Sequence, residues 1–241
     1  MDERKAKGIV DYAFKDIFGR PNPFSLDEIR KRFAYDINIP ERVKDSVSGK
    51  ETWTVNRKAK KFMHSDDVSM ALGKNTWAKP KREIRSMDDL LKGWHEINYF
   101  ATEKEINSRD IAQSESIYYS TGIFGSTRVV QSKNVVFSEY IFESQYIVAS
   151  LYNIASAAAM RIFDSETTAS SFAVEWSAKI SKSMYILNCV DMYECLFCSN
   201  LQSKKYCIGN MQFTKEEYLP IKEMVIDWTI ENFGKGNDEG F

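Results

Sequence analysis

Aliphatic and small polar residues alternate at every third position over about 100 residues of the chain. The series begins at Ser108, with Ile or Val between successive serines as far as Ser150. Near Ala159 the small polar and the aliphatic residues exchange places in the series, which then continues to Cys207. A helix repeats its apolar positions every 3.6 residues and a simple strand every 2, so a period of six that never drifts fits neither.

This pattern predicts a β-solenoid over residues 108–210 of a mainly β chain. Short strands joined by tight corners would turn each of these side chains inward, and successive coils would stack at about 4.8 Å. Serine and cysteine suit the interior because they are small and can hydrogen-bond to the backbone. The even spacing of three and three resembles tight right-handed solenoids with 12-residue coils, such as the beetle antifreeze proteins. The left-handed hexapeptide helix of acyltransferases is spaced unevenly. We expect about eight coils.

An outer series of apolar residues follows many of the inward positions by four residues. Its members are Tyr118, Phe124, Val130, Val136, Phe142, Val148, Ile154, Met160, Phe172, Met184, Val190 and Leu196. One or both outer faces of the solenoid are therefore expected to be apolar, and such a surface needs a cover. The N-terminal region, a second copy or another partner would supply it.

Residues 1–107 lack the repeat and are predicted to form helices joined by loops. Ser25–Glu28 and Ser86–Asp89 resemble capping boxes, and each precedes apolar residues at helical spacing. These apolar residues are Ile29 and Phe33 in the first segment, and Leu90, Leu91, Trp94 and Ile97 in the second. Thr214–Glu217 opens a last amphipathic helix within residues 211–241, which we expect to cap one end of the solenoid.

The positive charge is concentrated in one loop, although the whole chain has 33 basic and 34 acidic residues. Residues 42–85 hold 12 basic and 5 acidic side chains. Lys58, Lys61, Lys81 and Arg82 are the residues we would assign to a phosphate ligand. Such a run is more often a solvated loop, so nucleic acid is an alternative partner that we do not favour.

The four cysteines, Cys189, Cys195, Cys198 and Cys207, invite a zinc interpretation, and Cys195 and Cys198 have the spacing of a ligand pair. All four fall in the inward register of the repeat, so we predict reduced core thiols and no cofactor. Zinc and a disulfide are the alternatives. No segment reaches the roughly 20 apolar residues of a membrane span, and the N-terminus lacks a secretory signal, so we expect a cytoplasmic protein with no membrane partner.

Enzyme activity is not favoured by the sequence. Acyltransferases on hexapeptide scaffolds use a histidine base between coils, whereas the two histidines here, His64 and His95, lie outside the repeat. An acyltransferase-like enzyme would have to bring His95 into a cleft. No paired nucleophile and base, phosphate-binding glycine loop or pair of metal-binding carboxylates is recognisable.

The end of the repeat carries the most specific motif, Asn200–Ile208 followed by Gln212–Tyr218. With it the chain resembles a group of uncharacterised Ser/Cys-rich repeat proteins of tailed phages and of bacteria with reduced genomes. The resemblance covers roughly residues 80–232 and implies the architecture and a viral setting, in a host cytoplasm or a virion, but no activity. Many positions here carry Ser or Ile where that group carries Cys.

Our first functional hypothesis is a non-enzymatic structural or interaction protein that assembles with itself or with a larger complex. The second is a protein that sequesters a small molecule or nucleotide with the basic loop. The acyltransferase-like enzyme is the third.

Overall fold

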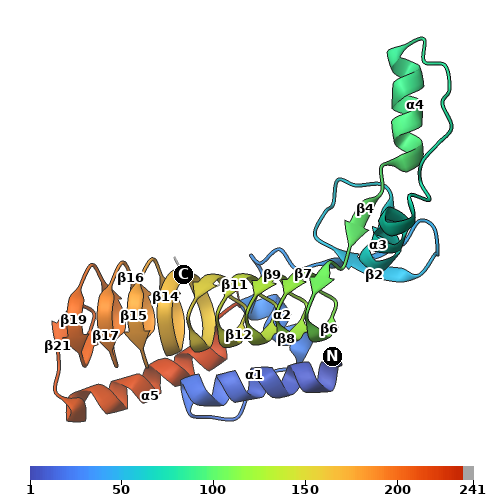
Figure 1. Cartoon of the computed structure of the whole chain (residues 1–241). Helices are drawn as coiled ribbons and strands as arrows, with labels where there is room; N and C mark the ends of the chain where they lie inside the picture. Colours follow the sequence, from blue (N-terminus) through green and yellow to red (C-terminus); the bar gives the residue numbers. More distant parts are fainter. Residues whose placement is uncertain (236–241) are drawn as a thin grey trace.

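The computed structural model describes residues 1–235 and contains a β-solenoid of about nine turns over residues 105–208 (Figure 1). The helices are α1 (Glu3–Phe18), α2 (Leu26–Phe33), α3 (Ser65–Lys74), α4 (Met87–Ile97) and α5 (Lys215–Asn232). The strands outside the solenoid are β1 (Glu41–Lys44), β2 (Glu51–Thr54), β3 (Phe62–His64) and β4 (Phe100–Thr102). The last residues that we assigned to the C-terminal region, 236–241, lie outside the described part of the chain.

The strands of the solenoid pair in parallel with a register of 12 residues, which confirms the predicted coil length. Arg109, for example, pairs with Thr121, and Leu196 pairs with Ile208. The strands are β5 (Glu105–Ile106), β6 (Arg109–Ala112), β7 (Glu115–Tyr118), β8 (Thr121–Phe124), β9 (Thr127–Val130), β10 (Lys133–Val136), β11 (Glu139–Phe142), β12 (Gln145–Val148), β13 (Leu151–Ile154), β14 (Ala157–Glu175), β15 (Ala178–Ser181), β16 (Met184–Leu187), β17 (Val190–Tyr193), β18 (Leu196–Ser199), β19 (Gln202–Lys205), β20 (Cys207–Ile208) and β21 (Met211–Gln212).

The backbone itself repeats every three residues. From Asn107 to Tyr206, every third residue has a positive φ and lies in the left-handed region. Gly122 and Gly125 are the only glycines among them, and Thr167 is the only β-branched residue. Each left-handed residue interrupts the alternation of an ordinary strand, so an inward side chain recurs after three residues instead of two.

The serines hold the corners of the coils through two hydrogen bonds each. The hydroxyl of Ser120 donates to the carbonyl of Tyr118 at 2.8 Å, and it accepts the backbone N–H of Ser132 in the next coil at 3.1 Å. The same pair of contacts recurs at Ser126 and Ser138, for example. These side chains therefore satisfy backbone groups that the turns remove from the strand ladders.

The exchange of serine and aliphatic columns occurs inside the long strand β14. Before it, strand positions pair as Gln145 with Ala157; after it, they pair as Phe172 with Met184, so the strand segment begins three residues further along the coil. Asn153 stands at this point, stacked in register between Ile141 and Ser165. Its side chain is fully buried and neither amide atom has a hydrogen-bond partner.

One outer column of apolar residues is covered by helices from both ends of the chain. Its buried members pack into one core cluster with residues of α1, α2 and α5: Phe124, Val136, Val148, Met160, Phe172, Met184 and Leu196. The predicted C-terminal helix is present, but α5 runs back along the side of the coils instead of closing their end (Figure 1). The reason is that its buried residues, which include Val225 and Ile226, match the long apolar column on that side.

The N-terminal region contains the two helices with predicted capping boxes, and also strands that were not predicted. Ser25 and Ser86 each accept the N3 backbone N–H of their helix while the N3 carboxylate accepts the cap N–H. The strands β3 and β4 have only three residues each and pair across more than 30 residues of chain. Elements that short carry little periodicity, so sequence patterns do not reveal them.

Candidate docking site

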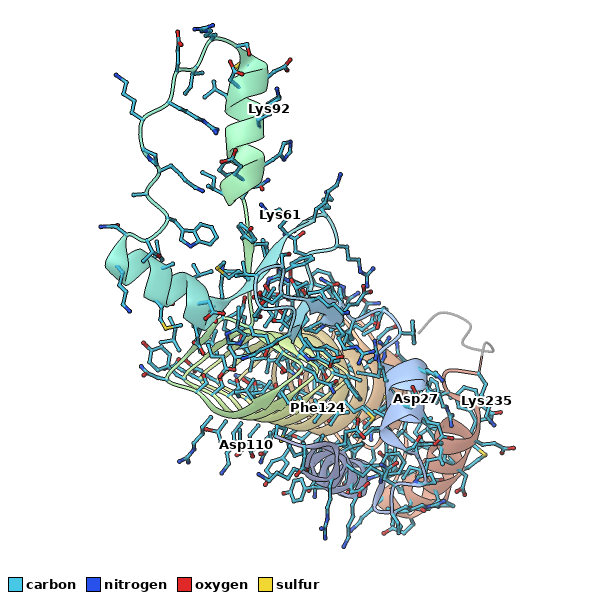
Figure 2. The ribbon with its side chains drawn as sticks, turned by 90° about the vertical axis from the view of Figure 1, so that its right-hand side faces the viewer. Asp27, Lys61, Lys92, Asp110, Phe124 and Lys235 are labelled. Carbon is cyan, nitrogen blue, oxygen red and sulfur yellow. The ribbon has the colours of Figure 1, made fainter. Side chains whose placement is uncertain are left out.

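Residues 57–102 form an arm that stands away from the coils at the N-terminal end of the solenoid (Figure 1). The parallel pair of β3 and β4 forms its base, α3 and α4 are its helices, and an extended segment of residues 79–85 leads into α4. The Lys61 side chain lies near the base of α4, and Lys92 lies on α4 itself (Figure 2). The arm therefore presents most of its length to the surroundings.

The arm has almost no core of its own. Between His64 and Ala101 no side chain is buried, although this part contains two complete helices. The apolar stripe of α4 is uncovered, with Trp94 58% exposed and Leu90 45% exposed. The remaining members of the stripe are Met87, Leu91 and Ile97. An amphipathic helix gains most of its stability from packing that stripe against something, so an uncovered stripe indicates a docking surface.

A groove of about 560 Å³ runs between α4 and the extended segment. Arg82 crosses it and forms an ion pair with Glu96 at 3.1 Å. Gly93 permits this crossing, because a Cβ atom at that position would collide with the Arg82 guanidinium. At the start of α4, the backbone N–H of Arg85 and the Ser86 hydroxyl hold the pKa of the Asp89 carboxyl below its usual range. The arm is therefore a defined structure even though it lacks a core.

The four basic residues assigned to a phosphate ligand line two neighbouring grooves, which share Trp94. Lys58 and Lys61 line one groove, while Lys81 and Arg82 line the groove between α4 and the extended segment. The Lys61 ammonium donates to the carbonyls of His95 and Glu96, at 2.6 and 3.2 Å, and so caps the C-terminus of α4. Two of the four cations, Lys61 and Arg82, are thus engaged by the arm itself.

The side of the solenoid opposite the covered column has exposed apolar residues in the coils where the serine and aliphatic columns exchange. We call this surface the open face; it comprises outward residues of the coils between 151 and 191. Its exposed apolar residues are Tyr152, Ile154, Trp176, Leu187 and Val190, and its charged residues are Asp164, Glu166, Glu175, Asp191 and Lys179. Trp176, at 56% exposed, packs edge-on against the ring of Phe163. The outer series predicted from the sequence contains Ile154 and Val190 but not Tyr152, Trp176 or Leu187, and it did not show which side the helices would leave open.

The cysteines lie inside the last coils, in the inward register of the repeat. All four are buried, and the thiols of Cys189, Cys195 and Cys198 contact the carbonyls two residues before them, as the serines do. Among residues 1–235, no group of three or more His, Cys, Asp or Glu side chains is arranged to hold a metal ion. His95 is exposed on α4 and lines the same groove as Lys58 and Lys61.

We expect the four thiols to resist modification while the protein is folded. Burial raises the pKa of the Cys207 thiol to about 11, whereas a hydrogen bond with Cys198 lowers the pKa of the Cys195 thiol. The resistance of all four therefore rests on their burial inside the coils, which keeps the reagent away. Titration with Ellman's reagent should detect less than one thiol per chain within minutes in buffer, and all four after denaturation in guanidinium. Rapid reaction of two or more thiols in the folded protein would contradict their placement in the interior.

None of the helices described here is long and apolar enough to cross a membrane. No family model, curated protein or solved structure matches this chain.

Proposed function

We propose that the protein is a non-enzymatic assembly component that associates with copies of itself, using the arm as its docking element. The observation that supports this proposal is the complete lack of buried side chains between His64 and Ala101. A segment that folds into helices but buries nothing gains its core from another molecule. The solenoid behind it is a rigid support, since each coil is hydrogen-bonded to the next.

The arm offers the kind of surface that carries binding energy in protein interfaces. Tryptophan is strongly enriched among residues whose loss weakens association, and the arm exposes both Trp77 and Trp94. Five apolar side chains of α4 follow each other along one stripe, which suits a helix that packs on a flat apolar surface.

The proposal is tested by the oligomeric state of the wild-type protein and of an arm variant. We expect light scattering after gel filtration, and native mass spectrometry, to show a multimer for the wild type. The double variant Leu90→Asp/Trp94→Asp should weaken association at least about 30-fold, which corresponds to about 2 kcal/mol. Its melting temperature as a monomer should be unchanged, because neither side chain is buried in the chain itself.

Met224→Asp is the matched control for this test. Met224 is an apolar residue of α5 that is 62% exposed, so its replacement puts an aspartate on a helix outside the arm, with one added charge where the arm variant has two. It should leave the multimer intact. A wild-type protein that stays monomeric at high concentration, or an arm variant that associates like the wild type, would contradict the proposal.

A further inference from the structure

The geometry points to the open face of a second copy as the surface on which the arm docks. This inference rests on the proposed function and adds the identity of the receiving surface. In the resulting dimer, α4 of each copy would lie on the solenoid of the other, so one type of contact would occur twice, as two-fold symmetry requires.

The two surfaces match in chemical character. Both expose apolar side chains around a tryptophan, Trp94 in the stripe of α4 and Trp176 on the open face, where charged residues lie between the apolar ones. Neither is covered by another segment of residues 1–235, whereas the opposite side of the solenoid is closed by α1, α2 and α5. Burying one against the other would remove both exposed apolar surfaces from water.

The extended segment beside α4 also matches the open face in charge, although α4 itself has three acidic side chains and one basic one. The extended segment of the arm, residues 79–85, has four basic side chains and one acidic one. The open face has the reverse balance, with four acidic side chains and one basic one. Asp164, Glu166 and Glu175 form no ion pair within the described residues, and neither do Lys79 and Lys81 of the arm. Opposite charges at the edge of an apolar contact select the partner and its orientation.

The dimensions of the two surfaces agree as well. Helix α4 has 11 residues. At 1.5 Å per residue, it extends about 16 Å. The open face spans four coils, and the column Ile154, Glu166, Ala178 and Val190 has one residue from each. At about 4.8 Å per coil, four rows extend over roughly 14 to 19 Å. The helix and the face are thus of equal length.

The arm of the same chain is poorly placed to make this contact. It leaves the solenoid before the first coil and points away from the stack (Figure 1). The open face begins about four coils further on, at Leu151, which is on the order of 20 Å along the axis. A second copy has no such constraint, because its arm can approach the face from outside.

Chemical crosslinking between two single-cysteine variants tests the inference directly. Lys81→Cys places a thiol on the arm and Glu166→Cys places one on the open face; both positions are exposed. The native thiols are buried, so a short bismaleimide should react at the introduced cysteines. When the two variants are mixed, we expect a crosslinked dimer on a denaturing gel at several times the yield obtained with Lys81→Cys and Glu216→Cys. Glu216 is an exposed residue on α5 that serves as the control.

A charge exchange gives an independent measurement on the same contact. Glu166→Lys should weaken association about 10-fold, and combining it with Lys81→Glu should restore most of that loss. Restoration requires that the two side chains meet, so a merely structural effect of either change would not produce it.

The remaining outcomes separate the inference from the proposed function. A multimer that crosslinks only between two Lys81→Cys chains would show that arms pair with arms, which would overturn the inference and leave the proposed function intact. A multimer with no crosslink above the control would also overturn the inference alone. A monomeric wild-type protein would overturn both.

Discussion

Replacing Phe172 with Ala should destabilise the protein by about 3–5 kcal/mol, the usual cost of removing a large aromatic side chain from a core. Phe172 belongs to the covered column and is fully buried. Its ring lies 5.3 Å from that of Phe18 in α1, 5.6 Å from Tyr185 and 5.0 Å from Phe233, measured between centroids. It therefore joins the solenoid to both ends of the chain. In a protein of this size, the melting temperature should fall by roughly 10 °C.

Phe142→Ala is the matched control, because Phe142 occupies the outer column on the other side of the solenoid. It pairs in register with Val130 and Ile154 and is only half-buried. We expect a loss of about 1 kcal/mol there, since less apolar surface is removed from water. Thermal or urea denaturation at low protein concentration measures both variants. If both variants lost the same free energy of unfolding, packing against α1 and α5 would add nothing to the contribution of Phe172.

Replacing Asn153 with Val should stabilise the protein by about 1–3 kcal/mol, the desolvation cost of a buried polar group that makes no hydrogen bond. Its amide is buried among inward side chains with no partner for either atom. Valine extends the aliphatic column of Ile117, Val129 and Ile141 by one coil and removes the two unsatisfied groups. The free energy of unfolding in urea is the measurement.

Ser150→Val, one inward position earlier, should have the opposite effect. The Ser150 hydroxyl donates to the carbonyl of Val148 at 3.0 Å and accepts the N–H of Ile162 at 3.3 Å. Its loss leaves both backbone groups without these contacts, at a cost of about 1–3 kcal/mol. If Asn153→Val destabilised the protein as much as Ser150→Val, the Asn153 amide would have to be satisfied by buried water.

The sequence reveals the solenoid because inward positions tolerate few side chains. Only small or aliphatic residues fit inside a narrow coil, so positions such as Ser108 and Ile111 repeat visibly, and the 12-residue register follows from their spacing. The residues in the left-handed region, by contrast, produce no recognisable sequence pattern. Their side chains point outward and range from Ala149 to Tyr152 and Trp176, so no residue type marks them.

The docking surface could be predicted only in part. The capping box at Ser86 and the spacing of Leu90, Trp94 and Ile97 predict an amphipathic helix and its apolar stripe. Periodicity shows which side of a helix is apolar but not what covers it, so the exposure of α4 needed the structure. The basic loop was a weaker guide, because the sequence could not show that Lys61 caps α4 or that Arg82 pairs with Glu96.

The three-residue backbone step also limits how the length of this protein can change. Insertion or deletion of a single residue inside the solenoid would put left-handed geometry on inward residues in every later coil. An insertion of three residues would keep the inward phase but turn all later columns by a quarter of a coil, carrying Phe172 and Met184 away from α5. Only insertions or deletions of whole 12-residue coils preserve both the inward phase and the direction of the outer columns. The distance between the arm and the C-terminal coils can therefore be varied only in steps of about 4.8 Å.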